Sequence, residues 1–192
     1  MKYVKVIVYA ILIYFLIRFT IFMATDYQTP AGRMHLPFVL WVIDTIDLFI
    51  HEAGHAVFAL FGRMVHFLGG TLLQIIIPVA AVVVFAKNSL RSLPFTLYWT
   101  GHSIINSSIY IADAPYQQLP LISRNSIHDW HWIFSELGMM EDAEIIGAIV
   151  NIIGVGACVV GIGIGLYFLF IDIKLLFSKD AQSNSAQFWG DE

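Results

Sequence analysis

The chain has 192 residues, of which 58% are hydrophobic and 12% are charged, and its mean hydropathy is +0.76. A soluble domain carries about 25% charged residues, so this composition excludes an ordinary soluble protein and indicates one integral membrane domain. The net charge of −4 and the lack of a Lys/Arg-rich run with interleaved aromatic residues exclude nucleic-acid binding, and the single cysteine, Cys158, excludes a disulfide framework or a Cys-rich metal site.

Two apolar stretches in the first third of the chain predict membrane helices. Residues 4–24 are longer than the apolar core of a signal peptide, and no small-x-small cleavage site follows them. We therefore interpret them as an uncleaved helix rather than a signal peptide. A linker that contains proline and glycine leads to the second candidate span, residues 38–62.

The third apolar stretch, residues 68–86, begins with Gly69-Gly70 and contains Pro78 in its middle. Hydropathy alone does not separate a kinked span from a re-entrant hairpin here. If the stretch folds back, seven basic residues lie on one side of the membrane and two on the other: Lys2, Lys5, Arg63, Lys87, Arg91, Lys174 and Lys179 against Arg33 and Arg124. A full crossing divides them four against five, so the positive-inside rule favours the folded-back element, with both termini cytoplasmic.

The remaining apolar stretches are residues 94–113 and the glycine-rich residues 145–172. Ala157, Gly161 and Gly165 recur every fourth residue, so one helix face is lined with small residues and allows close approach of another helix. A contact between two copies of the chain is one expected use of this face.

These stretches together predict an all-α fold, a polytopic membrane helical bundle in residues 1–177. We expect four full spans plus a glycine-rich re-entrant or hairpin element, with five spans as the alternative. The polar residues 178–192 predict a disordered tail.

A polar motif, His51-Glu52-Ala53-Gly54-His55, lies within the second span. On a helix, residues four apart share a face, so both imidazoles can bind the same Zn²⁺ ion. Glu52 then lies beside the metal, where it can take a proton from a zinc-bound water. Charged groups at the centre of a membrane cost on the order of 3 kcal/mol each, and a metal compensates for that cost. The alternative is a polar contact between helices without metal.

Zinc needs a third protein ligand, with water in the fourth position. His102, Asn106 and Asp113 lie on nearly the same face of the fourth span. Asp113 is the first choice, because an uncompensated carboxylate near the membrane interior is costly. Its alternative role is to cap the turn before Pro115. His128, in the segment SIHDWHW, is the second choice.

Other polar residues are candidates for orienting a ligand or stabilising an oxyanion: Asp47, His102, Asn106 and Asp129. Asp47 could hold His51 in its metal-binding tautomer, or could face an aqueous cavity together with Asp44. We interpret His66 as a residue of a connecting segment without a functional role. Trp130 and Trp132 predict an aromatic belt at the membrane interface.

Residues 47–142 resemble the membrane-embedded zinc metalloproteases of the site-2 protease (M50) class, in particular small bacterial M50-like membrane proteins. The resemblance rests on HEAGH within a membrane span, GGTLLQIIIP, YIADAPY and HDW. It implies that His51 and His55 bind zinc, that Glu52 is the general base, and that 68–86 is re-entrant. The family's third ligand is an aspartate in an Asn-Pro-Asp-Gly-like context, which this sequence lacks; Ala112-Asp113-Ala114-Pro115 is its nearest analogue.

The expected function is that of a zinc-dependent intramembrane endopeptidase. It would act on membrane-protein or peptide substrates in the lipid bilayer of a bacterial inner membrane. One alternative is a non-proteolytic membrane zinc protein on the same fold, acting as scaffold, chaperone or metal handler. Others are a zinc enzyme of another class at the membrane face, and a proton or ion carrier that uses a relay of Asp44, Asp47, His102 and Asp113.

Overall fold

The computed structural model describes residues 2–28, 35–119, 121 and 127–188, and these residues form helices and no strand. Arg33 and Arg124, which enter the charge count, lie outside the described residues, as do residues 189–192 of the expected tail. The elements in chain order are α1 (Lys2–Ala24), η1 (Asp26–Gln28), α3 (Phe38–Phe58), η2 (Ala59–Phe61), α4 (Arg63–Asn88), η3 (Leu90–Ser92), α5 (Leu93–Ala112), α6 (Asp129–Leu137), η4 (Met140–Asp142) and α7 (Ala143–Phe188).

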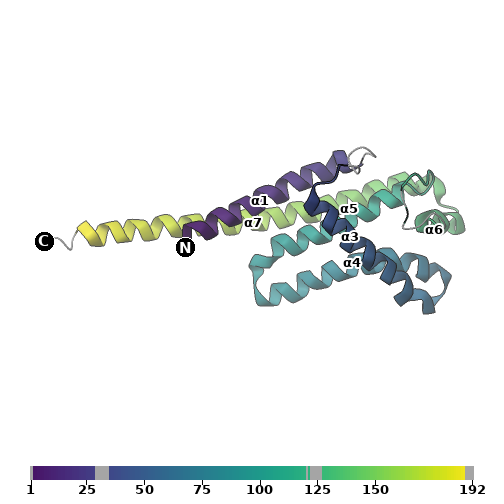
Figure 1. Ribbon diagram of the computed structural model, residues 1–192, viewed down its shortest axis with the longest axis horizontal. Helices are drawn as coiled ribbons and strands as arrows, with labels where there is room; N and C mark the ends of the chain where they lie inside the picture. The colour runs from purple at the N-terminus through teal and green to yellow at the C-terminus, as the bar shows by residue number, and fades with distance from the viewer. Residues whose placement is uncertain (1, 29–34, 120, 122–126, 189–192) are drawn as a thin grey trace.

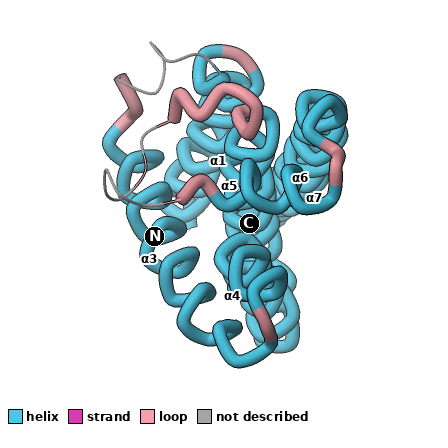
Figure 2. The backbone as a smooth tube through the Cα atoms, turned by 90° about the vertical axis from the view of Figure 1, so that its right-hand side faces the viewer, coloured by secondary structure: helices cyan, strands magenta, loops and turns pink. Residues whose placement is uncertain are grey.

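Four helices run along the long axis of the molecule in alternating directions, namely α1, α4, α5 and α7 (Figure 1). Helix α3 crosses them obliquely and ends beside the start of α4 (Figure 1). Seen end-on, α5 lies in the middle of the bundle, where it contacts α7, α4, α3, α1 and α6 (Figure 2). Both termini point toward the same end of the long axis, whereas α6 and the α3–α4 turn lie at the other end (Figure 1).

Among the described residues, three helical segments are long and apolar enough to cross a membrane: Tyr3–Gln28, Arg63–Asn88 and Met140–Ser178. The predicted class, an all-α membrane bundle, is therefore confirmed, but the number of such segments differs from the four expected. Helices α3 and α5, both expected as apolar spans, carry many polar side chains. Helix α5 has most of its residues buried by its neighbours, so its polar groups face protein rather than lipid.

The stretch 68–86 is part of one continuous helix, α4, and does not form the expected re-entrant or hairpin element. Gly69 and Gly70 are buried helical residues that allow α3 to pack against α4. A Cβ atom on Gly54 would overlap the carbonyl oxygen of Gly69, and one on Gly70 would overlap the ring of His51. The glycine pair therefore serves close helix packing rather than a turn.

Two residues of the small-residue face of α7, Gly161 and Gly165, are buried within the chain. A Cβ atom on Gly161 would contact the Pro94 carbonyl and Leu97 of α5, and one on Gly165 would overlap Ile13 of α1. Gly161 and Gly165 therefore permit close approach between α7 and its neighbours within one chain.

Helix α7 extends beyond the apolar region to Phe188, so the backbone of residues 178–188 is helical where the sequence predicted a disordered tail. This segment contains neither glycine nor proline, and several of its residues, such as Lys179, Ala181 and Gln182, favour helix.

The contact between Gly54 and α4 predicts a large effect from a single methyl group. We expect Gly54→Ala to destabilise the protein by about 1–3 kcal/mol, because the added Cβ must push two backbones apart. Gly156→Ala on α7 is the matched control, since nothing lies within 4 Å of its added Cβ. Thermal unfolding in detergent, followed by circular dichroism, measures both; equal melting temperatures would contradict this packing.

Candidate metal centre

Helices α3 and α6 bring two histidines and one aspartate to a common point. His51 and His55 lie one turn apart on α3, and their Nε2 atoms are 2.9 Å and 3.2 Å from Oδ2 of Asp129. Asp129 is the first residue of α6. Ligand atoms from the three residues all lie within 4.8 Å of one another. Two imidazole nitrogens and a carboxylate oxygen are a donor set that Zn²⁺ accepts, with a fourth position left for water.

The other ring nitrogen of each histidine is engaged by α4. Nδ1 of His55 donates to the backbone carbonyl of His66 at 2.9 Å, and Nδ1 of His51 lies 3.0 Å from Oε1 of Gln74. In return, Nδ1 of His66 donates to the carbonyl of His55 at 2.9 Å. With Nδ1 of each ring engaged by α4, Nε2 is the nitrogen that faces Asp129 and would bind a metal.

The charge of Asp129 suits a metal ligand. Burial raises the pKa of this carboxyl, but hydrogen bonds from His51 and His55 outweigh burial and lower the pKa to about 2. Asp129 is therefore ionised at neutral pH, and a metal ion bound among the three groups would take the place of the protons that the two imidazoles donate to it.

Glu52 shares a cavity of about 700 Å³ with the three candidate ligands. Its side chain is half-buried and makes no hydrogen bond to another described residue. The cavity also has an apolar wall, which consists of Leu36, Trp41, Leu48, Leu121 and Ile127. A carboxylate next to the candidate metal ligands and open to the cavity can accept a proton from a water molecule there.

Asp113 and His128, the two residues expected to supply the third ligand, lie elsewhere. The Asp113 carboxylate accepts the backbone N–H groups of Gln118 at 3.1 Å and Leu119 at 2.9 Å, and Nε2 of His128 lies 3.3 Å from its Oδ2. Asp113 therefore closes the turn after α5, which is the alternative role considered from sequence. Of the acidic residues considered, the one that reaches His51 and His55 is Asp129, because α6 folds back toward α3.

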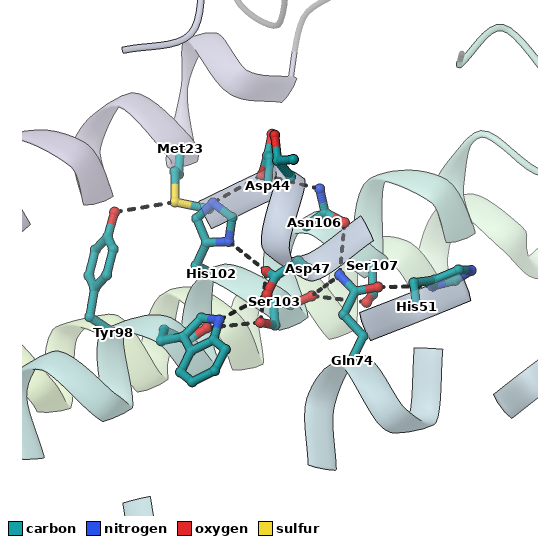
Figure 3. Close-up of polar contacts among 12 residues, drawn as sticks. Met23, Asp44, Asp47, His51, Gln74, Tyr98, His102, Ser103, Asn106 and Ser107 are labelled. Carbon is teal, nitrogen blue, oxygen red and sulfur yellow. Dashed lines mark hydrogen bonds and ion pairs between the residues drawn. The ribbon is translucent and has the colours of Figure 1, made fainter. Parts of the chain in front are cut away.

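Asp47, His102 and Asn106 belong to a second polar cluster beside the centre (Figure 3). Asp47 is fully buried and accepts hydrogen bonds from Nε1 of Trp99 at 2.8 Å, Nδ1 of His102 at 3.0 Å and Oγ of Ser103 at 2.9 Å. Asp47 therefore orients His102. Its position four residues before His51 had predicted that it would orient His51 instead.

Sequence reasoning missed three residues of this region. Gln74 is the one amide in an otherwise apolar run, and that pattern could have indicated a polar role for it. The expected place of His66 in a connecting segment did not indicate a role for it. Trp130, expected at a membrane interface, lines the cavity and donates from Nε1 to Thr71 Oγ1 at 3.2 Å. Trp132 likewise packs inward, stacked on Phe67 with ring centroids 4.4 Å apart.

The geometry predicts which aspartate is needed for metal binding. We expect Asp129→Ala to abolish stoichiometric zinc binding, because it removes the oxygen on which both Nε2 atoms converge. Asp113→Ala should keep zinc, and Glu136→Ala, an exposed acidic residue on the same α6 helix, is the matched control. Elemental analysis of protein purified in detergent measures the zinc content; loss of zinc in Asp113→Ala with retention in Asp129→Ala would contradict the assignment.

Comparison with known proteins does not identify this site. No protein-family model, no curated protein and no solved structure matches the chain. The assignments of His51, His55, Asp129 and Glu52 therefore rest on the contacts described above.

Proposed function

We propose that the chain is a zinc-dependent intramembrane endopeptidase, similar in its HEAGH motif to the site-2 protease class. The observation that carries the proposal is the convergence of His51 Nε2 and His55 Nε2 on one Asp129 oxygen, with Glu52 in the same cavity. When bound there, zinc supplies Lewis acidity, which activates water and polarises a carbonyl. The intact Glu52 favours hydrolysis over a scaffold or metal-handling role, since metal binding alone does not need it.

The residues of the chain then divide the work of hydrolysis. His51, His55 and Asp129 hold the metal, and Gln74 and the His66 carbonyl fix the two rings. Glu52 accepts the proton that water loses as its oxygen bonds to the peptide carbon, and delivers it to the nitrogen as the C–N bond breaks. The net reaction adds one water across one peptide bond.

The cavity indicates the kind of substrate. Its volume of about 700 Å³ accommodates a short peptide segment rather than a folded domain. Its apolar wall faces the candidate ligands and suits the hydrophobic side chains of a membrane-associated protein. We therefore propose membrane-protein or peptide segments as the substrate class.

The ion-carrier alternative has one observation in its favour, the cluster of half-buried Asp44 with the buried Asp47 and His102, because charged groups inside membrane proteins often serve transport. The fourth member of that expected relay, Asp113, closes the turn after α5 instead. Protein that carries no zinc when purified would promote this alternative.

We also propose that both termini lie in the cytoplasm of a bacterial cell, with α1, α4, α5 and α7 crossing the inner membrane. Most basic residues of the described segments lie toward the end of the bundle where the termini and η3 are found: Lys2, Lys5, Lys87, Arg91, Lys174 and Lys179. Arg63, at the start of α4, is at the opposite end. This distribution follows the positive-inside rule.

The proposed mechanism predicts that Glu52→Gln separates catalysis from metal binding. The variant should lose about 10²- to 10⁴-fold in peptide hydrolysis, because its amide cannot take up the proton, while its zinc content stays that of the wild type. The assay uses membrane-helix peptides in detergent, with and without a chelator, and Glu136→Gln as the matched control. Full activity in Glu52→Gln would refute the mechanism.

The proposed topology places the α3–α4 turn outside the cell and the α4–α5 turn inside. Cysteines can be introduced singly at Leu60 and Leu90, exposed leucines of these two turns, in a Cys158→Ala background. In intact cells a membrane-impermeant maleimide should label Leu60→Cys and leave Leu90→Cys unlabelled. Protection of both cysteines, or labelling of Leu90→Cys alone, would contradict this topology.

A further inference from the structure

We infer that Asp44 is a positioning residue for the metal centre and determines, through a directed series of hydrogen bonds, which ring nitrogen of His51 carries the proton and which is left to bind the metal. The inference rests on the proposed metal centre at His51, His55 and Asp129. It concerns residues that do not touch that centre, apart from Gln74 at the end of the chain.

The direction of the chain is set at Asp44, because a carboxylate can only accept hydrogen bonds. The Tyr27 hydroxyl lies 2.9 Å and 3.0 Å from the two Asp44 oxygens, so Tyr27 donates a hydrogen bond to Asp44. The Tyr27 oxygen is then free to accept, and Nδ2 of Asn106 donates to it at 2.7 Å. Nδ2 of Asn106 also lies 3.4 Å from Asp44 Oδ1, which favours the same orientation of the amide.

The orientation of Asn106 fixes that of Gln74. With its Nδ2 turned toward Tyr27 and Asp44, Asn106 presents Oδ1 to Gln74, and Nε2 of Gln74 donates to it at 2.9 Å. The backbone carbonyl of Ser103, 3.5 Å from the same Nε2, is a second acceptor on that side. Gln74 therefore presents Oε1, and not its amino group, to Nδ1 of His51 at 3.0 Å (Figure 3).

The consequence for His51 follows from the same donor and acceptor rules. An oxygen at Gln74 requires a proton on Nδ1, which leaves the lone pair on Nε2 for a metal. If the amide turned over, its amino group would face Nδ1, the proton would lie on Nε2, and that nitrogen could not bind a metal.

The second cluster also contacts Asp44. His102 is completely buried; its Nδ1 donates to Asp47 at 3.0 Å and its Nε2 lies 3.1 Å from Asp44 Oδ1 in an ion-pair contact outside hydrogen-bond geometry. His102 therefore lies between two carboxylates, one at each ring nitrogen, and holds Asp44 next to Asp47 (Figure 3).

The test is a double-mutant cycle on zinc affinity with Asp44→Asn and Gln74→Glu. Asp44→Asn puts a group that can donate a hydrogen bond at the start of the hydrogen-bond series, so the side-chain amide of Gln74 can turn over. We expect zinc to bind about 10- to 100-fold more weakly to this variant. Gln74→Glu places an acceptor-only carboxylate against His51, and its orientation does not depend on Asn106 or Asp44. In that background Asp44→Asn should not weaken zinc binding. Competition with a zinc chelator in detergent measures each affinity.

A second variant and a second readout separate orientation from folding. Asn106→Leu interrupts the hydrogen-bond series but leaves Asp44, His102 and Asp47 in contact. It should weaken zinc binding when residue 74 is the native Gln74 and not when it is changed to Glu. In metal-free protein, ¹⁵N resonances of the histidine rings should show His51 protonated on Nδ1 in the wild type and partly unprotonated there in Asp44→Asn.

Equal loss of affinity from Asp44→Asn in both backgrounds would overturn the inference, since it would indicate a structural effect only, and so would an unchanged His51 tautomer. These results are distinguishable from failure of the proposed function. The tautomer is read without metal or substrate, and a protein that binds zinc but cuts no peptide would contradict the endopeptidase proposal alone.

Discussion

Helices α3 and α4 approach so closely at Gly54, Gly69 and Gly70 that no side chain fits between their backbones. This contact places the His51 ring against Gln74 and makes the exchange of hydrogen bonds between His55 and His66 possible. Both imidazoles then have Nδ1 engaged and Nε2 directed toward Asp129. The geometry of the candidate centre therefore depends first on backbone contact, and only then on the ligands.

The polar groups in the bundle are shielded by protein rather than left in lipid. Helix α5 is buried among its neighbours and carries the polar face formed by Trp99, His102, Ser103 and Asn106. That face pairs with Asp44 and Asp47 of α3, and Gln74 of α4 joins it to His51. The cost of desolvating each charge is offset by a partner, as membrane interiors require. The two polar clusters are one continuous network, and the cavity lies beside it.

The sequence predicted the helical membrane class and the pairing of His51 with His55, because both follow from periodicity along one helix. The same reasoning chose Asp113 by its helical face, and spacing on a helix carries no information about a residue whose position depends on a connecting segment. Asp129 reaches the histidines because the chain turns back after α5 and α6 packs against α4. A glycine pair such as Gly69-Gly70 can form a turn or allow close contact with another helix. Which of the two occurs depends on whether a helix packs against it, and the sequence of one segment does not specify that.

The central claim is that His51, His55 and Asp129 bind zinc. X-ray absorption at the zinc K-edge, on protein purified in detergent without added metal, tests it most directly. We expect one zinc per chain, two imidazole nitrogens at about 2.0–2.1 Å, and oxygen as the remaining ligands. Protein without bound zinc, or a zinc shell that lacks two imidazoles, would contradict this assignment of the ligands.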